Sequence, residues 1–350
     1  MPGHRWSSSI SHMVKKGLIK LAALIVIIIA LNFITRLFFT DYIWGDDVLN
    51  KKRTYLLENR GRYNAIFLGS SLTNYHIIPP LFDSLVTPVT LRSFNMGTGI
   101  FTNPEVYYIG TRLTGHDAIK PRYLFIELHN VLIPKKDDWH KVRFKYIMDL
   151  PTWSFAFNAM WHQKHIDRKA YILKNYTAQF LEHTLNMDLP VNYLKREKGH
   201  DFPPYYRIDA GFISAIRFPQ GRDNFDSARY ERSWSSWRKE YAMYKDEKEV
   251  NAVELKKVHD LIRCFREEGI HVIYILPPKS DYSSLQIQMG LFNNIPAANK
   301  INMADPFKFP EFYHIAHAHD RIHMNMVGAR LYTQRLAEEF NRLVMTQHLE

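Results

Sequence analysis

Cysteine is almost absent from the chain, which has one cysteine, Cys264, in 350 residues. A lone cysteine excludes an intramolecular disulfide framework and any zinc or iron–sulfur site built from several cysteines. Charged residues are also few, at 23%, whereas 46% of the residues are hydrophobic and 14% aromatic. This composition allows a substantial core and excludes a mainly disordered protein. Cys264 lies among apolar residues at helical spacing, and we expect it to be a buried structural thiol rather than a nucleophile.

Internal repeats, low-complexity tracts and two common active-site motifs are also missing. Without a Gly-x-Ser-x-Gly elbow, the chain does not fit the α/β-hydrolase fold. No glycine-rich loop of the usual phosphate-binding spacing follows the first predicted strand, which disfavours a flavodoxin-like domain that binds a phosphate cofactor. We therefore expect no cofactor.

Charge is missing from Leu21 to Thr35, and the apolar character continues to Phe39. Counted from Gly17 to Phe39, the run is long enough to cross a hydrocarbon core of about 30 Å. We predict a transmembrane anchor over residues 17–39, preceded by a tail over residues 1–16. A buried core helix is one alternative, and a cleaved signal peptide is another. No small-x-small cleavage site follows the run, which argues against the signal peptide.

Lys15, Lys16 and Lys20 precede the apolar run, whereas Asp46 and Asp47 follow it. The excess of Lys and Arg marks the N-terminal side as cytoplasmic. We therefore expect a single-pass membrane protein whose globular part lies outside the cytoplasm, on the periplasmic side of a bacterial inner membrane. The net charge of +11 would suit nucleic acid. An extracytoplasmic domain disfavours that partner and favours membrane lipid or an anionic envelope polymer.

Beyond the anchor, strand-like and helix-like segments alternate, which predicts an α/β fold with a parallel sheet covered on both faces. The predicted strands are 65–68, 90–94, 123–128, 271–276 and 300–303. A helix is predicted to begin with Asn103 as cap, Pro104 at its first position and Glu105 in its first turn. Further helices are predicted to end at Gly269 and to span Met326–Val344.

Between residues 135 and 250 the alternation breaks down, and this stretch holds Trp139, Trp153, Trp161, Trp234 and Trp237. We predict a mostly helical insertion over 135–250 between two parts of one domain, 40–134 and 251–350. Such a density of aromatic residues favours core packing. A carbohydrate-stacking surface or a membrane-interface surface remains an alternative.

Polar residues follow the predicted strands where the carboxyl ends of parallel strands meet. Ser71 follows the first strand, Gly97 the second and Asn130 the third, whereas Asp320 and His323 precede the last helix. Because a serine hydroxyl needs a base and the base an orienting carboxylate, we assign Ser71, His323 and Asp320 as a catalytic triad. The oxyanion would be held by the Ser71 and Gly97 N–H groups and the Asn130 side chain.

Asp137 and His140 have the same Asp-x-x-His spacing, but they lie in a charged segment with no strand to place them, so we interpret them as a solvated face. Two clusters that contain histidines are candidate metal sites. Neither contains a recognisable zinc motif, so we expect no metal site in either. These clusters are His314, His317 and His319, and His162, His165 and Asp167.

The segment FLGSSLT resembles the first motif of the SGNH, or GDSL-type, hydrolases, and FNMGTG resembles the second. DRIHMNMVGA is similar to the last motif, in which Asp and His stand three residues apart. The resemblance implies a three-layer α/β/α flavodoxin-like fold, with Ser71 as nucleophile and Gly97 in the oxyanion hole. The third motif, normally Gly-x-Asn-Asp, is displaced here. Asn130 is the expected oxyanion donor and His129 is its rival, and a third alternative is that both side chains are only solvated.

An anchor followed by such a domain resembles the envelope acyl-transfer proteins of teichoic-acid D-alanylation and alginate O-acetylation. The resemblance implies a serine esterase or O-acyltransferase that acts on an envelope polysaccharide or other glycan. It also implies a polytopic membrane acyltransferase as partner. The displaced third motif and the aromatic insertion leave open a catalytically inactive subunit that binds polysaccharide or scaffolds a membrane acylation complex.

Overall fold

The computed structural model describes residues 5–39, 46–99, 102–128, 139, 142–164, 168–185, 210–214, 226–278 and 285–347. Its centre is a five-stranded sheet in which every pairing is parallel, with the strand order β2-β1-β3-β4-β5. The strands are β1 (Ala65–Leu68), β2 (Ser93–Asn95), β3 (Tyr123–Glu127), β4 (His271–Leu276) and β5 (Lys300–Asn302). The predicted α/β class and parallel sheet are confirmed.

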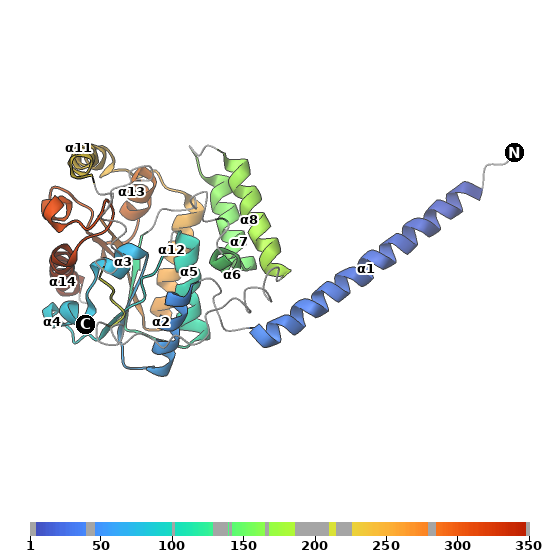
Figure 1. Ribbon diagram of the computed structural model, residues 1–350, viewed down its shortest axis with the longest axis horizontal. Coiled ribbons are helices and arrows are strands. Elements are labelled where there is room, and N and C mark those ends of the chain that lie inside the picture. Colours follow the sequence, from blue (N-terminus) through green and yellow to red (C-terminus); the bar gives the residue numbers. More distant parts are fainter. Residues whose placement is uncertain are drawn as a thin grey trace.

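Helices surround the sheet and account for most of the remaining described residues. They are α1 (Arg5–Phe39), α2 (Asp47–Glu58), α3 (Ser71–His76), α4 (Pro79–Leu85), α5 (Asn103–Thr111), α6 (Val142–Ile147), α7 (Leu150–His162), α8 (Lys169–Thr184), α11 (Ser227–Tyr244), α12 (Ala252–Glu267), α13 (Leu285–Asn293) and α14 (Met326–Gln347). Figure 1 shows α4 and α14 on one side of the sheet and α2, α5 and α12 on the other.

The strands are short apolar runs because both faces of the sheet are covered. All residues of β1 and β3 are buried, and Phe67 and Phe125 stack on neighbouring strands with ring centroids 4.5 Å apart. Phe82 of α4 and Phe340 of α14 pack against the Phe125 ring from one side. Val106 of α5 and Val258 of α12 belong to the same hydrophobic cluster as these rings, so the core includes both faces of the sheet.

The start of α5 differs from the prediction by one residue. Thr102, rather than Asn103, is the N-cap, and it forms a capping box with Glu105. Asn103 lies inside the helix, and its side chain donates to Glu254 of α12. Thr102 is the cap rather than Asn103 because Glu105 stands three residues after Thr102. The Thr102 side chain can then accept from the Glu105 backbone N–H, and the Glu105 side chain from the Thr102 backbone N–H.

Cys264 is exposed, so the expectation of a buried thiol was wrong. The buried face of α12 is formed by Val258, Leu261, Ile262 and Phe265. At 100° per residue, position 264 falls beside this apolar stripe rather than within it.

The aromatic stretch divides between two hydrophobic clusters. Trp139 and Tyr176 belong to a separate cluster formed by α6, α7 and α8. Trp237 of α11 instead belongs to the main core. Trp139 and Trp237 are almost fully buried, whereas Trp161 is 58% exposed. Core packing therefore explains part of the aromatic density, but it does not explain Trp161.

Within α1, the segment Met13–Ile34 is long and apolar enough to cross a membrane by length and composition, and none of it is buried in the protein. In Figure 1, α1 projects from the domain as a single long rod. A helix that is apolar on all sides and packs against little protein suits a lipid environment better than water.

Glu254, at the start of α12, is fully buried on the side of the sheet that α2, α5 and α12 cover. Its Oε1 accepts a hydrogen bond from Asn103, but no described residue hydrogen-bonds its Oε2. Burial raises the pKa of Glu254 from 4.5 to about 8, although the Asn103 bond opposes the shift. The folded protein therefore keeps this carboxyl protonated at neutral pH.

This protonation predicts that the contribution of Glu254 to the free energy of unfolding falls as the pH rises from 4.5 to about 8. In that window the unfolded chain releases the Glu254 proton and the folded chain retains it, which costs up to about 1.4 kcal/mol per pH unit. Glu254→Gln should remove this slope and stabilise the protein most at the alkaline end, as measured by chemical denaturation across the window. Glu267→Gln, at an exposed position of the same helix, is the matched control and should leave the slope intact. An unchanged slope in Glu254→Gln would show that the buried carboxyl ionises in the folded state.

Candidate active site

Ser71 lies at the tight connection between β1 and α3, where it is the first residue of the helix. Ser70 caps the helix, because its Oγ accepts a hydrogen bond from the backbone N–H two residues further on, at 3.0 Å. Gly69 is required at this bend, since an added Cβ would overlap Thr73 Oγ1 and the carboxylate of Glu127. The bend therefore holds the Ser71 hydroxyl at the carboxyl end of the sheet.

The structure brings Ser71, His323 and Asp320 together, although the serine and the histidine are 252 positions apart. His323 Nε2 lies 2.9 Å from Ser71 Oγ, and His323 Nδ1 lies 2.8 Å from Asp320 Oδ2. These contacts run from hydroxyl to imidazole to carboxylate in the order that proton abstraction from a serine requires.

A short turn before α14 orients the base. Asp320 Oδ1 accepts hydrogen bonds from the backbone N–H groups of Ile322, at 2.7 Å, and His323, at 2.8 Å. A β-bridge between Ala318 and Met324 closes the turn. Burial alone would raise the pKa of Asp320, but the hydrogen bonds from His323 and Ile322 lower it to about 2. Asp320 is therefore a carboxylate at any physiological pH, as an orienting group must be.

His76 lies behind His323 and is almost fully buried. Its Nε2 accepts a hydrogen bond from the Met324 N–H at 3.0 Å, so the ring supports the turn that carries the base. Burial, reinforced by His323, lowers the pKa of His76 from 6.5 to about 3. Tyr75 also contacts the His323 ring edge-on, with centroids 4.9 Å apart. The imidazole of His323 is thus packed against two neighbouring rings.

The three predicted oxyanion donors differ in their availability. No described residue accepts a hydrogen bond from the Ser71 N–H, so this group can point to an incoming oxyanion. The Gly97 N–H, by contrast, donates to Asn95 Oδ1 at 2.8 Å. Gly97 is nevertheless close to the serine helix, because an added Cβ there would overlap the backbone of Asn74. Asn130 and its rival His129 lie outside the described residues.

Lys52, from α2, ties the Gly97 loop to the serine helix. Its fully buried ammonium donates to Asn74 Oδ1 at 2.8 Å and to the Gly97 carbonyl at 2.6 Å. Burial lowers the pKa of Lys52 well below its ordinary value, and the nearby Asp46 opposes this shift. Lys52 therefore fixes the spacing between two of the segments that carry predicted site residues.

Glu127, the last residue of β3, holds the other side of the serine bend. Its buried carboxylate accepts from the Ser70 N–H at 2.9 Å and the Ser70 Oγ at 2.8 Å. It also accepts from the Thr73 N–H at 3.1 Å and the Thr73 Oγ1 at 2.6 Å. Ser71 lies between these two anchored residues, so Glu127 sets where its hydroxyl points.

Neither Lys52 nor Glu127 was predicted from the sequence as a residue of the site. A usable signal existed for Glu127, since it is an acidic residue at the end of a strand that is otherwise apolar. A carboxylate predicted to be buried must find several donors, and the nearest ones belong to the serine bend. No comparable signal marks Lys52, which lies on an amphipathic helix with other charged residues.

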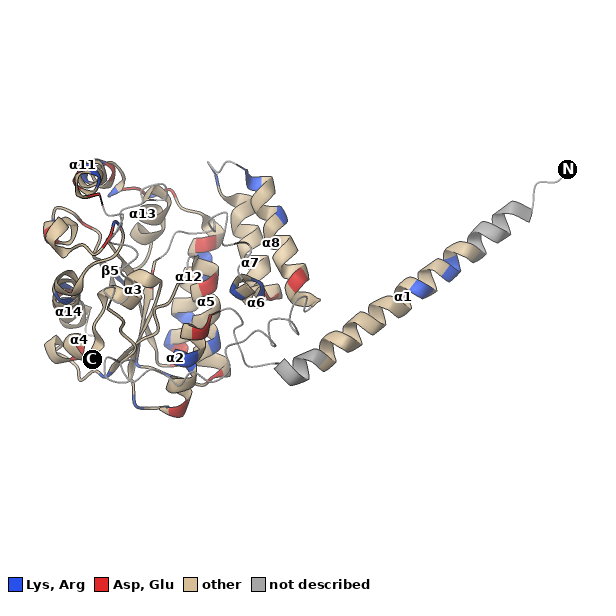
Figure 2. Cartoon of the chain, in the orientation of Figure 1, with Lys and Arg blue, Asp and Glu red and all other residues tan. Residues whose placement is uncertain are grey.

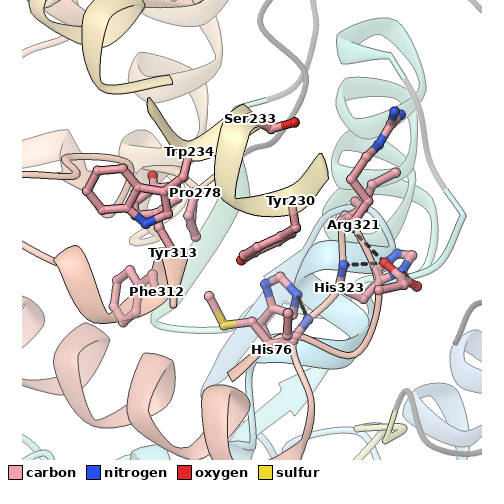
Figure 3. Close-up of a pocket in the computed structure, with 13 residues that line it drawn as sticks. His76, Tyr230, Ser233, Trp234, Pro278, Phe312, Tyr313, Arg321 and His323 are labelled. Atoms are coloured by element: carbon pink, nitrogen blue, oxygen red, sulfur yellow. Dashed lines mark hydrogen bonds and ion pairs between the residues drawn. The ribbon is translucent and has the colours of Figure 1, made fainter. Parts of the chain in front are cut away.

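A cavity lies on the Asp320–His323 side of the triad, and Ser71 does not line it. Figure 3 shows Tyr230 of α11 beside His76, whereas Trp234 of the same helix lies beside Tyr313. The lining of the cavity is otherwise mainly apolar and includes Pro278, Phe312, Tyr313, Ile322 and Met324.

A wider groove of about 890 Å³ adjoins this cavity, since Trp234 and Tyr313 line both. It runs between α11 and the segment Pro310–His317, and its lining includes Arg238 and Lys239. A volume of this size is in the range of ligand sites. Aromatic and cationic side chains together suit a polar ligand that has an apolar face.

No group of three or more His, Cys, Asp or Glu residues able to hold a metal ion occurs among the residues that the structure describes. His317 Nδ1 lies 2.7 Å from the Glu311 carbonyl, and His314 Nδ1 accepts from the Ala316 N–H at 3.2 Å. Each of these rings is thus engaged by its own loop. His165, Asp167 and the pair Asp137 and His140 lie outside the described residues.

Comparison with protein-family models, with curated proteins and with solved structures found no match to this chain.

Proposed function

We propose that this chain is a membrane-anchored serine esterase or O-acyltransferase that acts on a glycan of the cell envelope. The observation that carries the proposal is the continuous hydrogen-bonded series from Ser71 Oγ through His323 to Asp320. A serine, a histidine and a carboxylate in this order form the basic apparatus for nucleophilic acyl transfer.

In the proposed reaction, Ser71 Oγ attacks the carbonyl carbon of an acyl donor while His323 Nε2 takes the hydroxyl proton. Asp320 stabilises the imidazolium, and the Ser71 N–H donates to the oxyanion. Collapse of the intermediate breaks the bond to the leaving group, which receives the proton from His323. The acyl group remains on Ser71 until His323 deprotonates an acceptor hydroxyl, giving transfer, or a water, giving hydrolysis.

The topology supports a relation to the SGNH hydrolases. The strand order β2-β1-β3-β4-β5 is that of flavodoxin-like sheets, and Ser71 follows the first strand at its carboxyl end. The motif residues Asp320 and His323 precede the last helix, as the resemblance implies. One feature differs from the SGNH pattern: the Gly97 N–H, which that resemblance places in the oxyanion hole, donates to Asn95 Oδ1 instead.

We propose that α1 anchors the chain with its N-terminus in the cytoplasm and its domain outside, on the periplasmic side of a bacterial inner membrane. The support is the length of the apolar segment and the placement of lysines before it and aspartates after it. In that location the acceptor would be an envelope polysaccharide, and the acyl donor would come from a polytopic membrane acyltransferase. The groove beside Trp234, with Arg238 and Lys239 in its lining, is our candidate for the acceptor.

Labelling by a fluorophosphonate probe tests the proposed nucleophile, because the probe reacts with serines that a base has activated. We expect the purified full chain to be labelled and Ser71→Ala to lose the label. Ser233→Ala is the matched control, since Ser233 lines the adjacent cavity without contacting His323, and it should label like the parent chain. Labelling that persists in Ser71→Ala would reject Ser71 as the nucleophile.

A catalytically inactive subunit that binds polysaccharide is the second candidate function. The observation that favours it is the Gly97 N–H, which is bound to Asn95 and so does not face an oxyanion. Such a subunit would leave the probe unreacted while the full chain still retained an envelope polysaccharide on a binding column. Binding that falls in Trp234→Ala but not in Ser71→Ala would support this second function.

A further inference from the structure

The outer face of the α7–α8 hairpin carries exposed apolar side chains that no described residue covers. Apart from those of α1, five of the large hydrophobic residues with high exposure gather here, each between 44% and 59% exposed. They are Leu150, Trp161, Tyr171, Leu181 and Leu185. An exposed apolar concentration of this kind indicates an interaction surface rather than ordinary surface composition.

The spacing on α8 shows that this is a helix with two apolar faces. Ile172, Leu173 and Tyr176 form the face that is buried against α6 and α7. Tyr171, Ala178, Leu181 and Leu185 recur at the helical period on the opposite side, and three of the four are strongly exposed. A second apolar face on a surface helix is unfavourable in water, so it implies an apolar partner.

α1 contacts the hairpin at the end of α8. The Asn32 side-chain amide donates to the carbonyl of Thr184, the last residue of α8. Within Met13–Ile34 every residue is exposed except Ile28 and Asn32, which are one helical turn apart and are partly covered. Both lie within about two turns of Ile34, which is five residues before the end of the predicted anchor at Phe39. If Met13–Ile34 spans the membrane, this contact is therefore near the membrane surface.

Figure 1 shows α8 running across the direction of α1, on the side of the domain from which α1 projects. If α1 crosses a membrane, a helix lying across it at this level is parallel to the membrane plane. The exposed face also carries an aromatic residue with a polar tip, Tyr171, and the hairpin exposes Trp161. These two residue types concentrate at membrane–water interfaces.

The charge of the hairpin matches anionic headgroups. Lys174 is exposed on α8, Arg168 is exposed at its N-cap, and Lys169 is partly exposed. Figure 2 shows blue Lys and Arg positions along α8. The acidic Glu182 pairs with Lys145 at 2.6 Å, so it contributes little net negative charge. Lys174 shares the face of Tyr171 and Leu181, and a basic side chain on an exposed apolar face is typical of helices that lie in the headgroup region of a bilayer.

We infer that the outer face of the α7–α8 hairpin lies on the lipid surface of the membrane that α1 spans. The inference rests on the proposed anchor, and it adds a second attachment that holds the domain in one orientation to the bilayer. The occupant of the face is lipid, rather than a second protein, because continuity with α1 places the face at the bilayer surface.

An environment-sensitive fluorophore on single cysteines tests this inference in the full chain. The chain is reconstituted in bilayers of phosphatidylethanolamine with a minor fraction of phosphatidylglycerol, and a nitroxide lipid quencher is added. Cys264→Ser removes the natural thiol, and Leu181→Cys and Tyr171→Cys then place the label on the proposed face. Met345→Cys on α14 is a matched control, as exposed as Leu181 but on the far side of the domain in Figure 1.

We expect a nitroxide near the headgroups to quench the labels at 181 and 171 several-fold more than the label at 345. Leu24→Cys reports on the anchor separately and should be quenched most by a nitroxide deep in the acyl chains. Quenching at 24 with solvent-like emission at 181 and 171 would overturn the surface contact and leave the anchor intact. Blue-shifted emission at 181 without lipid quenching would also overturn it, by identifying a protein partner. An unquenched label at 24 would reject the anchor itself, and with it the inference.

Discussion

The Asp320→Asn variant should lose about ten thousand-fold of its turnover of a nitrophenyl ester while keeping its fold. The Nδ1–H of His323 donates a hydrogen bond to Asp320 Oδ2, which leaves Nε2 free to receive the proton of Ser71. An asparagine amide in that place donates to Nδ1 and so favours the tautomer that carries its proton on Nε2. In that tautomer His323 cannot act as a base toward Ser71.

Asp305→Asn provides the matched control for this loss. Asp305 also accepts hydrogen bonds from two backbone N–H groups, those of Phe307 and Lys308, but it contacts no catalytic histidine. We expect its turnover to remain close to that of the parent chain. Turnover of Asp320→Asn within tenfold of the parent would show that the triad does not carry the reaction.

The Glu127→Ala variant should lose both stability and turnover, because four hydrogen bonds to the serine bend end on this carboxylate. Leaving several buried donors without an acceptor is expected to lower the free energy of unfolding by about 3 kcal/mol or more. Ser71 would then shift relative to His323, and a displacement of the nucleophile by ~1 Å can lower the rate about a hundredfold. Chemical denaturation and steady-state kinetics well below the unfolding transition measure the two effects.

A split between kcat and KM distinguishes positioning of Ser71 from a merely structural role for Glu127. If Glu127 orients the nucleophile, kcat should fall while KM changes little. Glu254→Gln is the comparison, since it alters another buried carboxyl without contacting the serine helix, and its kcat should not fall. A Glu127→Ala variant with normal kcat in its folded state would contradict the positioning role.

The sheet could be predicted because each of its strands has a local signature. In β1, β3 and β4 nearly every residue is apolar and buried, since helices cover both faces, and these runs stop at glycine, polar or proline residues. The edge strands β2 and β5 are only three residues long, and the prediction for β2 began too early, at Thr90. Short strands carry too few residues for a pattern to fix their ends.

The aromatic stretch could not be interpreted in the same way. Trp237 and Trp161 both lie on helices of this stretch, yet one is almost fully buried and the other is mostly exposed. Helical periodicity defines an apolar face, but it does not say which neighbour covers that face. The same limit explains Cys264, whose apolar neighbours in sequence belong to the adjacent stripe of α12.

By itself, the sequence determined the α/β class, the apolar N-terminal helix and the candidate roles of Ser71, Asp320 and His323. These features depend on composition, periodicity and short motifs, which act over a few residues. Only the tertiary structure decided that His323 reaches Ser71, that Glu127 and Lys52 hold the serine helix, and that the Gly97 N–H is already bound. Contacts between distant segments depend on how the helices pack around the sheet, and local sequence patterns do not encode that packing.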